Sequence, residues 1–249
     1  MKIEKSVGFS PANRPRGVIF GPEGSGKSTL CSKLDKVIFL NVEDGISGID
    51  VESVKINSWT DFVTTIKEIA KATVEQFPYE NIVIDSLTAL ERMLHAHICQ
   101  LSGTTSIVLA HGGYGKGLVE ATTQISMLIN QLANRKDIGI WFVAHSTVKN
   151  VNDPTRGEYA SFQVRADRGM AEWCTSWADL IGFVEVDIMV STDGKPVLRK
   201  EGNEVRRTVT TTPRGGLTAK SRIQCVTGTM TVDDFVLKVN SIFSVKKVK

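Results

Sequence analysis

Short runs of consecutive apolar residues alternate with longer amphipathic stretches along most of this chain. Runs of strand length occupy residues 16–20, 36–42, 81–86 and 138–144, and a shorter one occupies 51–56. Strands that are apolar on both faces are typical of a parallel sheet covered on each side, which argues for an α/β architecture.

Segments with apolar residues at helical spacing lie between these runs. The first of these segments begins at residue 28, and the others cover 58–77, 87–101, 118–133 and 231–243. The second opens with Ser58-Trp59-Thr60-Asp61, which resembles a capping box, and Pro78 ends it. Strands that alternate with helices predict a mostly parallel central sheet with helices on both faces.

The pattern changes after Asp187. Apolar and polar residues then alternate, with a turn at Asp193-Gly194 and a further strand over 206–212. These features predict antiparallel strands that extend one edge of the sheet. We therefore expect a flexible N-terminal arm over 1–15, one domain over 16–243, and a disordered basic tail over 244–249.

Composition narrows the class of protein only slightly. The 249 residues are 41% hydrophobic and 23% charged, with a net charge of +3, which is ordinary for a globular protein. The sequence contains no run of eighteen apolar residues, so it predicts no membrane span. The four cysteines are scattered. We expect a cytoplasmic protein with reduced cysteines and no membrane partner.

The first apolar run leads into the motif that organises the chain, G-x-x-x-x-G-K-[ST]. Its residues are Gly21, Pro22, Glu23, Gly24, Ser25, Gly26, Lys27, Ser28 and Thr29. A glycine-rich turn between a strand and a helix lets backbone N–H groups surround a phosphate. Lys27 would reach the β- and γ-phosphates, and the Ser28 hydroxyl would take one place on Mg²⁺. The motif predicts that ATP and Mg²⁺ bind here.

Polar residues at the ends of three later strands complete this prediction. Asp85 ends the strand over 81–86, where a P-loop NTPase carries the acid that holds Mg²⁺. Glu43 ends the strand after the P-loop helix and could polarise the water that attacks the γ-phosphate, or could be a solvated acid beside Asp44. His145 ends the strand over 138–144 and could sense the γ-phosphate. His95, His97 and Cys99 share a helix, but no fourth ligand is spaced to join them in a metal site.

The order of these motifs resembles the RecA-type ATPase core. It is particularly similar to phage-encoded, AAA-type, core-only RecA relatives associated with single-strand annealing and recombination. The resemblance covers about residues 15–240 and implies a RecA-like P-loop NTPase fold. It implies that Glu43 is the catalytic acid and that His145 couples the γ-phosphate to DNA-binding loops. RecA itself has Gln at the latter position, and His occurs in the phage relatives.

The resemblance also assigns DNA binding to two polar segments, the glycine-rich loop 102–117 and the segment 146–170. Cations in them would neutralise phosphates, and aromatic rings would stack on bases. The candidates are Tyr114, Lys116, Lys149, Arg156, Tyr159, Phe162, Arg165 and Arg168. The acids Asp153, Glu158 and Asp167 dilute this charge, and a polar loop with some Arg is the alternative interpretation.

Lys220 and Arg222 match the Lys-x-Lys or Lys-x-Arg pair that RecA and KaiC-type ATPases direct at the γ-phosphate of a neighbouring subunit. That role would require subunits packed head to tail, in a ring or a helical filament. A solvated basic loop is the alternative.

These expectations combine into an ATPase that recombines or anneals single-stranded DNA, in the cytoplasm of a bacterial host if the gene is carried by a phage. A single-strand-binding protein is a further candidate partner. Three alternatives stay open at this stage: an ATP-binding annealing scaffold with little hydrolysis, a helicase or loader motor, and a small-molecule P-loop kinase.

Overall fold

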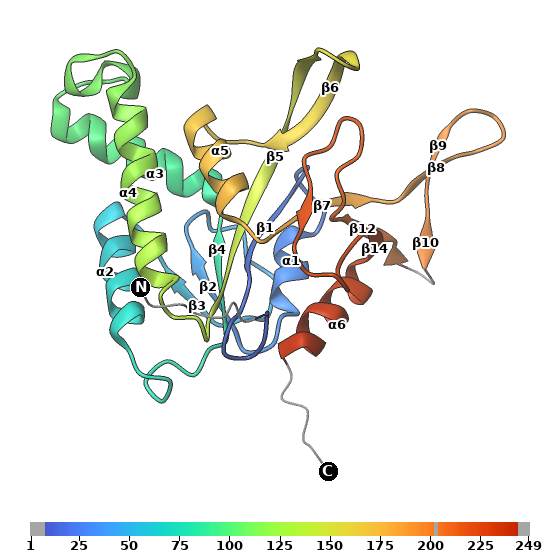
Figure 1. Ribbon diagram of the computed structural model, residues 1–249, viewed down its shortest axis with the longest axis horizontal. Coiled ribbons are helices and arrows are strands. Elements are labelled where there is room, and N and C mark those ends of the chain that lie inside the picture. The colour runs from blue at the N-terminus through green and yellow to red at the C-terminus, as the bar shows by residue number, and fades with distance from the viewer. Residues whose placement is uncertain (1–7, 202–203, 244–249) are drawn as a thin grey trace, which may run out of the picture.

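The computed structural model describes residues 8–201 and 204–243. In this part of the chain ten strands form one sheet, whose main path has the order β14-β12-β7-β1-β5-β4-β2-β3 (Figure 1). The strands of this path are β1 (Arg16–Gly21), β2 (Val37–Asn41), β3 (Ser53–Lys55), β4 (Asn81–Asp85), β5 (Gly139–Asp153), β7 (Leu180–Val186), β12 (Arg207–Thr210) and β14 (Thr229–Thr231).

The centre of the sheet is parallel, as the continuous apolar runs predict. β1 lies between β5 and β7, and β4 lies between β5 and β2, all in parallel register. The register places Gly21 opposite His145 and Asn41 opposite Asp85. The strands that carry the candidate site residues therefore end along one edge of the sheet.

Helices cover both faces, and each face has its own apolar core. On one face, α1 (Lys27–Ser32) and α6 (Val232–Phe243) pack on residues that include Phe39 and Trp141. On the other face lie α2 (Trp59–Lys71), α3 (Leu87–Ser102), α4 (Lys116–Leu132) and α5 (Arg168–Trp177) (Figure 1). The predicted layers, with helices on both faces of a mostly parallel sheet, are confirmed.

The C-terminal edge of the sheet is antiparallel, also as predicted. β12 pairs with β7 and β14, and β13 (Lys220–Ser221) pairs with the start of β7. Between β7 and β12 the chain forms an arm with β8 (Ile188–Val190), β9 (Pro196–Leu198), β10 (Lys200–Glu201) and β11 (Glu204–Val205). This arm projects from the right of the molecule in Figure 1.

The segment 146–170 is not the loop that its polarity predicts. β5 continues past His145 to Asp153 and pairs with β6 (Gly157–Val164) in an antiparallel hairpin. The Asp153 carboxylate accepts hydrogen bonds from the backbone N–H groups of Thr155 and Arg156, which closes the turn. Gly157 follows with a φ of 78°, which favours glycine.

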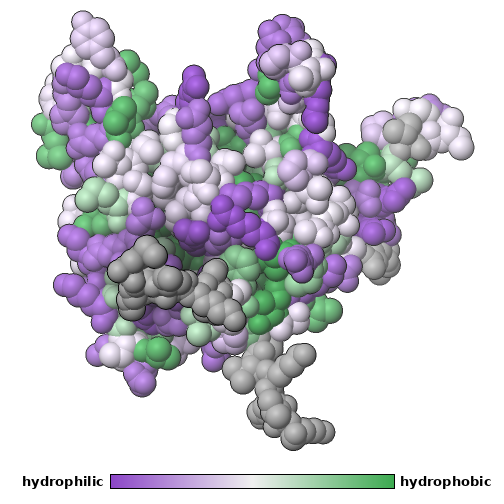
Figure 2. All heavy atoms as spheres, in the orientation of Figure 1, coloured by the Kyte–Doolittle hydropathy of each residue, from purple (hydrophilic) through white to green (hydrophobic). Residues whose placement is uncertain are grey.

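Two other boundaries differ from the prediction. α2 ends at Lys71 rather than near residue 77, because side chains of Thr73 and Gln76 bond backbone N–H groups beyond the helix. The glycine-rich loop contains a 3₁₀ turn, η1 (Ile107–Gly112), and α4 begins at Lys116. Figure 2 shows the α3–η1–α4 tip and the β5–β6 hairpin projecting from the same side, with a hollow between them.

The ends of the chain are described in part. Within the predicted arm, the Arg14 side chain is buried and pairs with Glu80, and its backbone N–H donates to the Lys136 carbonyl. Residues 1–7 and the basic tail 244–249 lie outside the described residues. None of the helices described here has both the length and the apolar character needed to cross a membrane.

Candidate functional site

The glycine-rich turn between β1 and α1 has the backbone shape that a phosphate loop needs. Gly24 and Gly26 have φ values of 72° and 91°, a region in which residues with a side chain are strained. Ser25 stabilises the turn through its hydroxyl, which donates to the Pro22 carbonyl at 2.8 Å. This hydrogen bond and the two glycines therefore define the shape of the turn.

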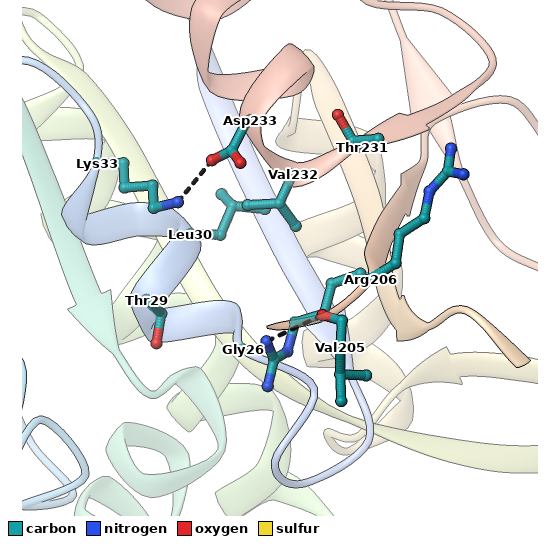
Figure 3. Close-up of a pocket in the computed structure, with 10 residues that line it drawn as sticks. Gly26, Thr29, Leu30, Lys33, Val205, Arg206, Thr231, Val232 and Asp233 are labelled. Carbon is teal, nitrogen blue, oxygen red and sulfur yellow. Dashed lines mark hydrogen bonds and ion pairs between the residues drawn. The ribbon is translucent and has the colours of Figure 1, made fainter. Parts of the chain in front are cut away.

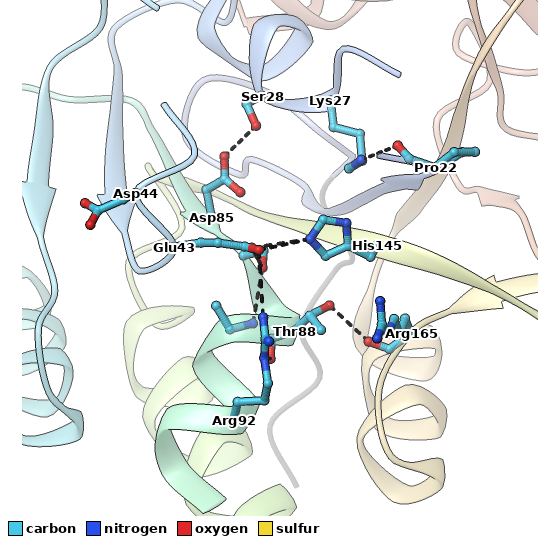
Figure 4. A network of polar contacts seen from close by, with 12 residues as sticks. Pro22, Lys27, Ser28, Glu43, Asp44, Asp85, Thr88, Arg92, His145 and Arg165 are labelled. Carbon is cyan, nitrogen blue, oxygen red and sulfur yellow. Dashed lines mark hydrogen bonds and ion pairs between the residues drawn. The ribbon is translucent and has the colours of Figure 1, made fainter. Parts of the chain in front are cut away.

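Lys27 is held inside this turn, with only 6% of its surface exposed. Its Nζ donates to the Pro22 carbonyl at 2.6 Å (Figure 4). Burial lowers the pKa of Lys27, and the carboxylates of Asp85 and Glu23 partly oppose that effect. A bound phosphate would place a negative charge beside this desolvated ammonium group and stabilise it.

Ser28 and Asp85 meet as the sequence predicts. The Ser28 hydroxyl donates to Oδ2 of Asp85 at 2.6 Å, between the start of α1 and the end of β4 (Figure 4). Burial raises the pKa of Asp85, and the hydrogen bond from Ser28 counteracts this. A hydroxyl beside a carboxylate is the oxygen donor set that suits Mg²⁺, so these residues fit the ion.

Glu43 and His145 were predicted to have separate roles, and the fold brings them into contact. Nε2 of His145 lies 3.2 Å from Oε1 of Glu43. The Ser86 hydroxyl donates to the same carboxylate, and Nη2 of Arg92 lies 3.8 Å from it (Figure 4). Burial opposes ionisation of Glu43, but these hydrogen bonds and charges prevail and lower its pKa. Glu43 is therefore an oriented carboxylate rather than a freely solvated acid.

Sequence reasoning missed Ser86 and Arg92. Ser86 directly follows Asp85 and caps α3, where its side chain also accepts from the Ala89 N–H. Arg92 lies almost two helical turns further along α3. The sequence shows that both residues follow Asp85, but their contact with Glu43 depends on β2 lying beside β4.

His145 also lies at the junction between the sheet and the hairpin. Its carbonyl accepts a hydrogen bond from the Arg165 N–H at 2.8 Å. The Arg165 carbonyl in turn accepts from the Thr88 hydroxyl at 3.0 Å, which ties the hairpin base to α3 (Figure 4). A displacement of His145 would therefore move β5 itself and, through the hydrogen bond to Arg165, the base of the hairpin.

One cavity of about 470 Å³ joins these groups. It includes a further cation that sequence reasoning missed, Arg207, at the start of β12. The site residues that line it are Lys27, Ser28, Glu43, Asp85 and His145, together with Glu23, Gly24, Gly26 and Thr29. Gly21 is closed in behind the turn, where an added methyl would lie 2.2 Å from the Val184 carbonyl oxygen.

Lys220 and Arg222 lie near the beginning of the parallel strands, whereas this cavity lies where those strands end. β13 pairs with Leu180 and Ile181, at the beginning of β7. Nη1 of Arg222 contacts Asp179 at 2.8 Å, and Nζ of Lys220 donates to the Thr175 carbonyl at 3.1 Å. These cations are remote from the phosphate loop of their own chain, so only a neighbouring chain could receive them at its site.

The candidate DNA-binding residues differ in exposure and in their partners, and Arg168 among them pairs with Glu172 at 2.8 Å. Tyr114, Lys116, Lys149, Arg156, Arg165 and Arg168 are exposed. Tyr159 lies opposite Val151, near the turn of the hairpin, and lines a cavity with Arg156. Phe162 lies on the other face of the hairpin, and its ring packs against Phe183 in a tilted arrangement with centroids 5.0 Å apart. The two aromatic residues therefore face different surroundings.

The helix with two histidines carries a polar cluster, although not the one weighed from the sequence. His95 lies with Glu91 and Asp167, and their ligand atoms are all within 4.8 Å of one another. Glu91 accepts hydrogen bonds from the Asp167 N–H, at the start of α5. Glu91 and Asp167 were missed because the contact depends on how α3 and α5 pack.

A family model described as an AAA domain matches residues 13–223 of the chain. A search of curated proteins gave no match. The matched residues include the phosphate loop, Glu43, Asp85, His145, and both Lys220 and Arg222.

Proposed function

The chain belongs to the AAA domain family and has an α/β P-loop NTPase fold, and from this premise we propose that it hydrolyses ATP in response to single-stranded DNA. In the proposed activity, hydrolysis accompanies DNA recombination or annealing by an oligomer of this chain. One observation carries the proposal: β5 passes from the nucleotide cavity at His145 directly into an exposed hairpin that bears cations.

The chemistry of the cavity supports nucleotide hydrolysis. Backbone N–H groups of the turn and the ammonium of Lys27 would bind the β- and γ-phosphates. Ser28 and Asp85 would hold Mg²⁺, which when bound neutralises charge on the phosphates. Glu43, held by Ser86 and His145, would orient the attacking water and accept its proton.

The hairpin supports coupling to DNA. Lys149 and Arg156 are exposed on it, and the Arg165 side chain is exposed at its base. Such cations bind the phosphate backbone without regard to sequence, and this binding weakens as salt is added. A ligand on the hairpin would shift the Arg165–His145 contact, and through it the hydrogen bond to Glu43.

The decisive experiment measures phosphate release with and without single-stranded DNA. We expect DNA to raise ATP turnover at low salt, and Lys27→Ala to abolish turnover in both conditions. Turnover that does not change with DNA over a range of low salt would contradict the proposal.

A second variant separates catalysis from scaffolding. Glu43→Gln keeps the shape of the side chain and should still bind ATP, but it should lose at least 100-fold in turnover, within the range for a general base. If strand annealing survives unchanged in Glu43→Gln, ATP acts only as a conformational ligand.

A further inference from the structure

We propose that Arg207 is a second phosphate-binding cation of the nucleotide site, supplied by the antiparallel edge strand of the same chain. The inference rests on the proposed binding of ATP and adds a residue to it. Arg207 would contact the phosphate chain beside Gly26.

The backbone of the phosphate loop and the Arg207 side chain are in direct contact. A methyl group built on Gly26 would lie 2.8 Å from Cδ and 3.0 Å from Nε of Arg207. Arg207 lines the cavity that holds Lys27 and Asp85, and it also lines an adjacent cavity of about 350 Å³. It therefore lies at the junction of the two spaces.

The second cavity extends the site along α1 (Figure 3). Thr29, Leu30 and Lys33 line it from α1, and Val232 and Asp233 line it from the start of α6. A nucleotide that fills both cavities would have its phosphates in one and its nucleoside in the other. Arg207 would then contact the phosphates at the point where the nucleotide passes from the first cavity into the second.

The guanidinium of Arg207 is partly buried and has few partners within the protein. Its Nε is buried and has no hydrogen-bond partner among the described residues. Nη1 makes one long contact, 3.5 Å from the Val205 carbonyl, and no ion pair to Arg207 is found in this part of the chain. A partly buried guanidinium that lines a cavity and has no carboxylate partner indicates a site prepared for an anion.

The neighbouring arginine provides the contrast. Nε of Arg206 is also buried without a hydrogen-bond partner among the described residues, but it lies 3.6 Å from Oδ2 of Asp187, so Arg206 has a countercharge. Figure 3 shows the Arg206 side chain directed away from Gly26. Two adjacent residues of one type thus differ in whether they have a countercharge.

The direction of β12 explains how Arg207 reaches the phosphate loop. β12 runs antiparallel to β7, so its first residue pairs with Val186 at the end of β7. The parallel strands end along that same edge, where the loop after β1 lies. An antiparallel edge strand therefore begins where a parallel strand would end, and its first side chain reaches the site.

The experiment compares Arg207→Gln, Arg207→Met and Arg207→Lys with the control Arg199→Gln in the full-length protein. Arg199 lies 3.8 Å from the Asp187 carboxylate and lines neither cavity. Equilibrium binding of ATP, ADP, AMP and adenosine is measured by calorimetry in EDTA, so that no metal contributes. We expect Arg207→Gln to weaken ATP and ADP binding about 10- to 100-fold, the range for one charge-assisted hydrogen bond. Adenosine binding should not change, Arg207→Lys should lose less, and Arg199→Gln should stay within about twofold.

Each outcome decides the inference. Equal ADP affinities in Arg207→Gln and Arg199→Gln overturn it, as does an equal loss for adenosine and ADP, which would place the contact on the nucleoside. If Arg207→Gln does not fold, the uncharged Arg207→Met decides: a loss for ADP without a loss for adenosine supports the inference, and no loss overturns it. Failure of the wild type to bind ATP when Mg²⁺ replaces EDTA, or ATP binding that survives Lys27→Ala, refutes the proposed function instead.

Discussion

At the scale of single residues, the site depends on side chains that hold one another in place. Glu43 receives hydrogen bonds or charge contacts from Ser86, His145 and Arg92, which come from two other elements. Lys27 and Ser28, by contrast, are positioned by the turn and by Asp85. The groups that would bind phosphate are organised locally, whereas the groups that would activate water are organised by the sheet.

Gly26→Ala tests the packing of the phosphate loop. The methyl group would meet Arg207, and a φ of 91° strains any residue with a side chain, at a cost of about 1–3 kcal/mol. We expect ATP affinity, measured by calorimetry, to fall at least about tenfold. Gly48→Ala is the control, because Gly48 has a φ of 87° with nothing within 4 Å of the added methyl. Equal ATP affinity in the two variants would contradict the expectation.

At the scale of elements, the β5–β6 hairpin and α5 connect the nucleotide edge of the sheet to exposed surfaces. The hairpin is anchored by Phe162 on Phe183 and by backbone bonds between Phe162 and both Gly216 and Thr218. Its other face carries Tyr159 above a cavity. We therefore expect substitutions of Phe162 and Tyr159, only three residues apart, to have different effects.

Phe162→Ala and Tyr159→Ala should separate stability from DNA binding. Loss of the Phe162 ring should lower the free energy of unfolding by about 2 kcal/mol, which is below the range of about 3–5 kcal/mol for a buried Phe because Phe162 is 38% exposed. Tyr159→Ala should leave stability nearly unchanged and weaken single-stranded DNA binding about tenfold, since stacking on one base contributes about 1–3 kcal/mol. Urea unfolding and fluorescence anisotropy measure the two effects. Unchanged DNA affinity in Tyr159→Ala would rule out its stacking role.

The contact between α3 and α5 predicts a pH dependence of stability. Glu91 is buried beside His95, Asp167 and Cys174, and burial raises its pKa from about 4.5 to about 7, aided by the Asp167 charge and opposed by the bond from the Asp167 N–H. The protonated carboxyl favours the folded state, so its contribution is complete below about pH 4.5 and is lost as the pH rises to about 7.

Glu91→Gln mimics the protonated carboxyl and should remove this loss. We expect it to raise the free energy of unfolding at pH 8 by up to about 3 kcal/mol and to have little effect at pH 4.5. Urea unfolding across this pH range measures the difference, with Glu68→Gln on the exposed side of α2 as the control. The assignment would be wrong if Glu91→Gln and Glu68→Gln gave the same pH profile.

At the scale of the whole molecule, the two sets of predicted catalytic residues lie at opposite edges of one sheet. The phosphate loop follows the end of β1, whereas Lys220 and Arg222 lie beside the beginning of β7. Burial, and the nearby charge of Arg222, lower the pKa of Lys220. Arg222 shares Asp179 with Arg16, so it also has a role in the fold. A contribution to catalysis therefore requires a head-to-tail neighbour.

Mixing two inactive variants tests this arrangement. Lys27→Ala lacks a working phosphate loop, and Lys220→Ala lacks the cation for its neighbour; Lys220 is chosen because Arg222 is paired within its own chain. We expect each variant to be inactive alone and an equal mixture to recover about a quarter of wild-type ATP turnover, since that share of interfaces combines two intact halves. No recovery, in mixtures that light scattering shows to be assembled, would leave Lys220 without a role in trans.

The local features of this chain were readable from its sequence. Continuous apolar runs identified the parallel strands, and the glycine spacing identified the phosphate loop, because each property belongs to a few consecutive residues. The polar residues at strand ends were also found, since parallel strands that end at one edge bring such residues together. The hairpin over 146–164 was missed because its alternation is mostly polar, and pairing rather than composition makes it a strand.

Contacts between distant segments were decided only by the tertiary structure. Arg207 reaches Gly26 because β12 runs antiparallel at the edge. Arg206, the residue before β12, does not, because its side chain is directed away from Gly26 (Figure 3). The alternation of side chains along a strand separates Tyr159 from Phe162, and helix packing brings Glu91 to Asp167. Residue type and spacing define what a side chain can do, but strand direction and helix packing define which partner it meets.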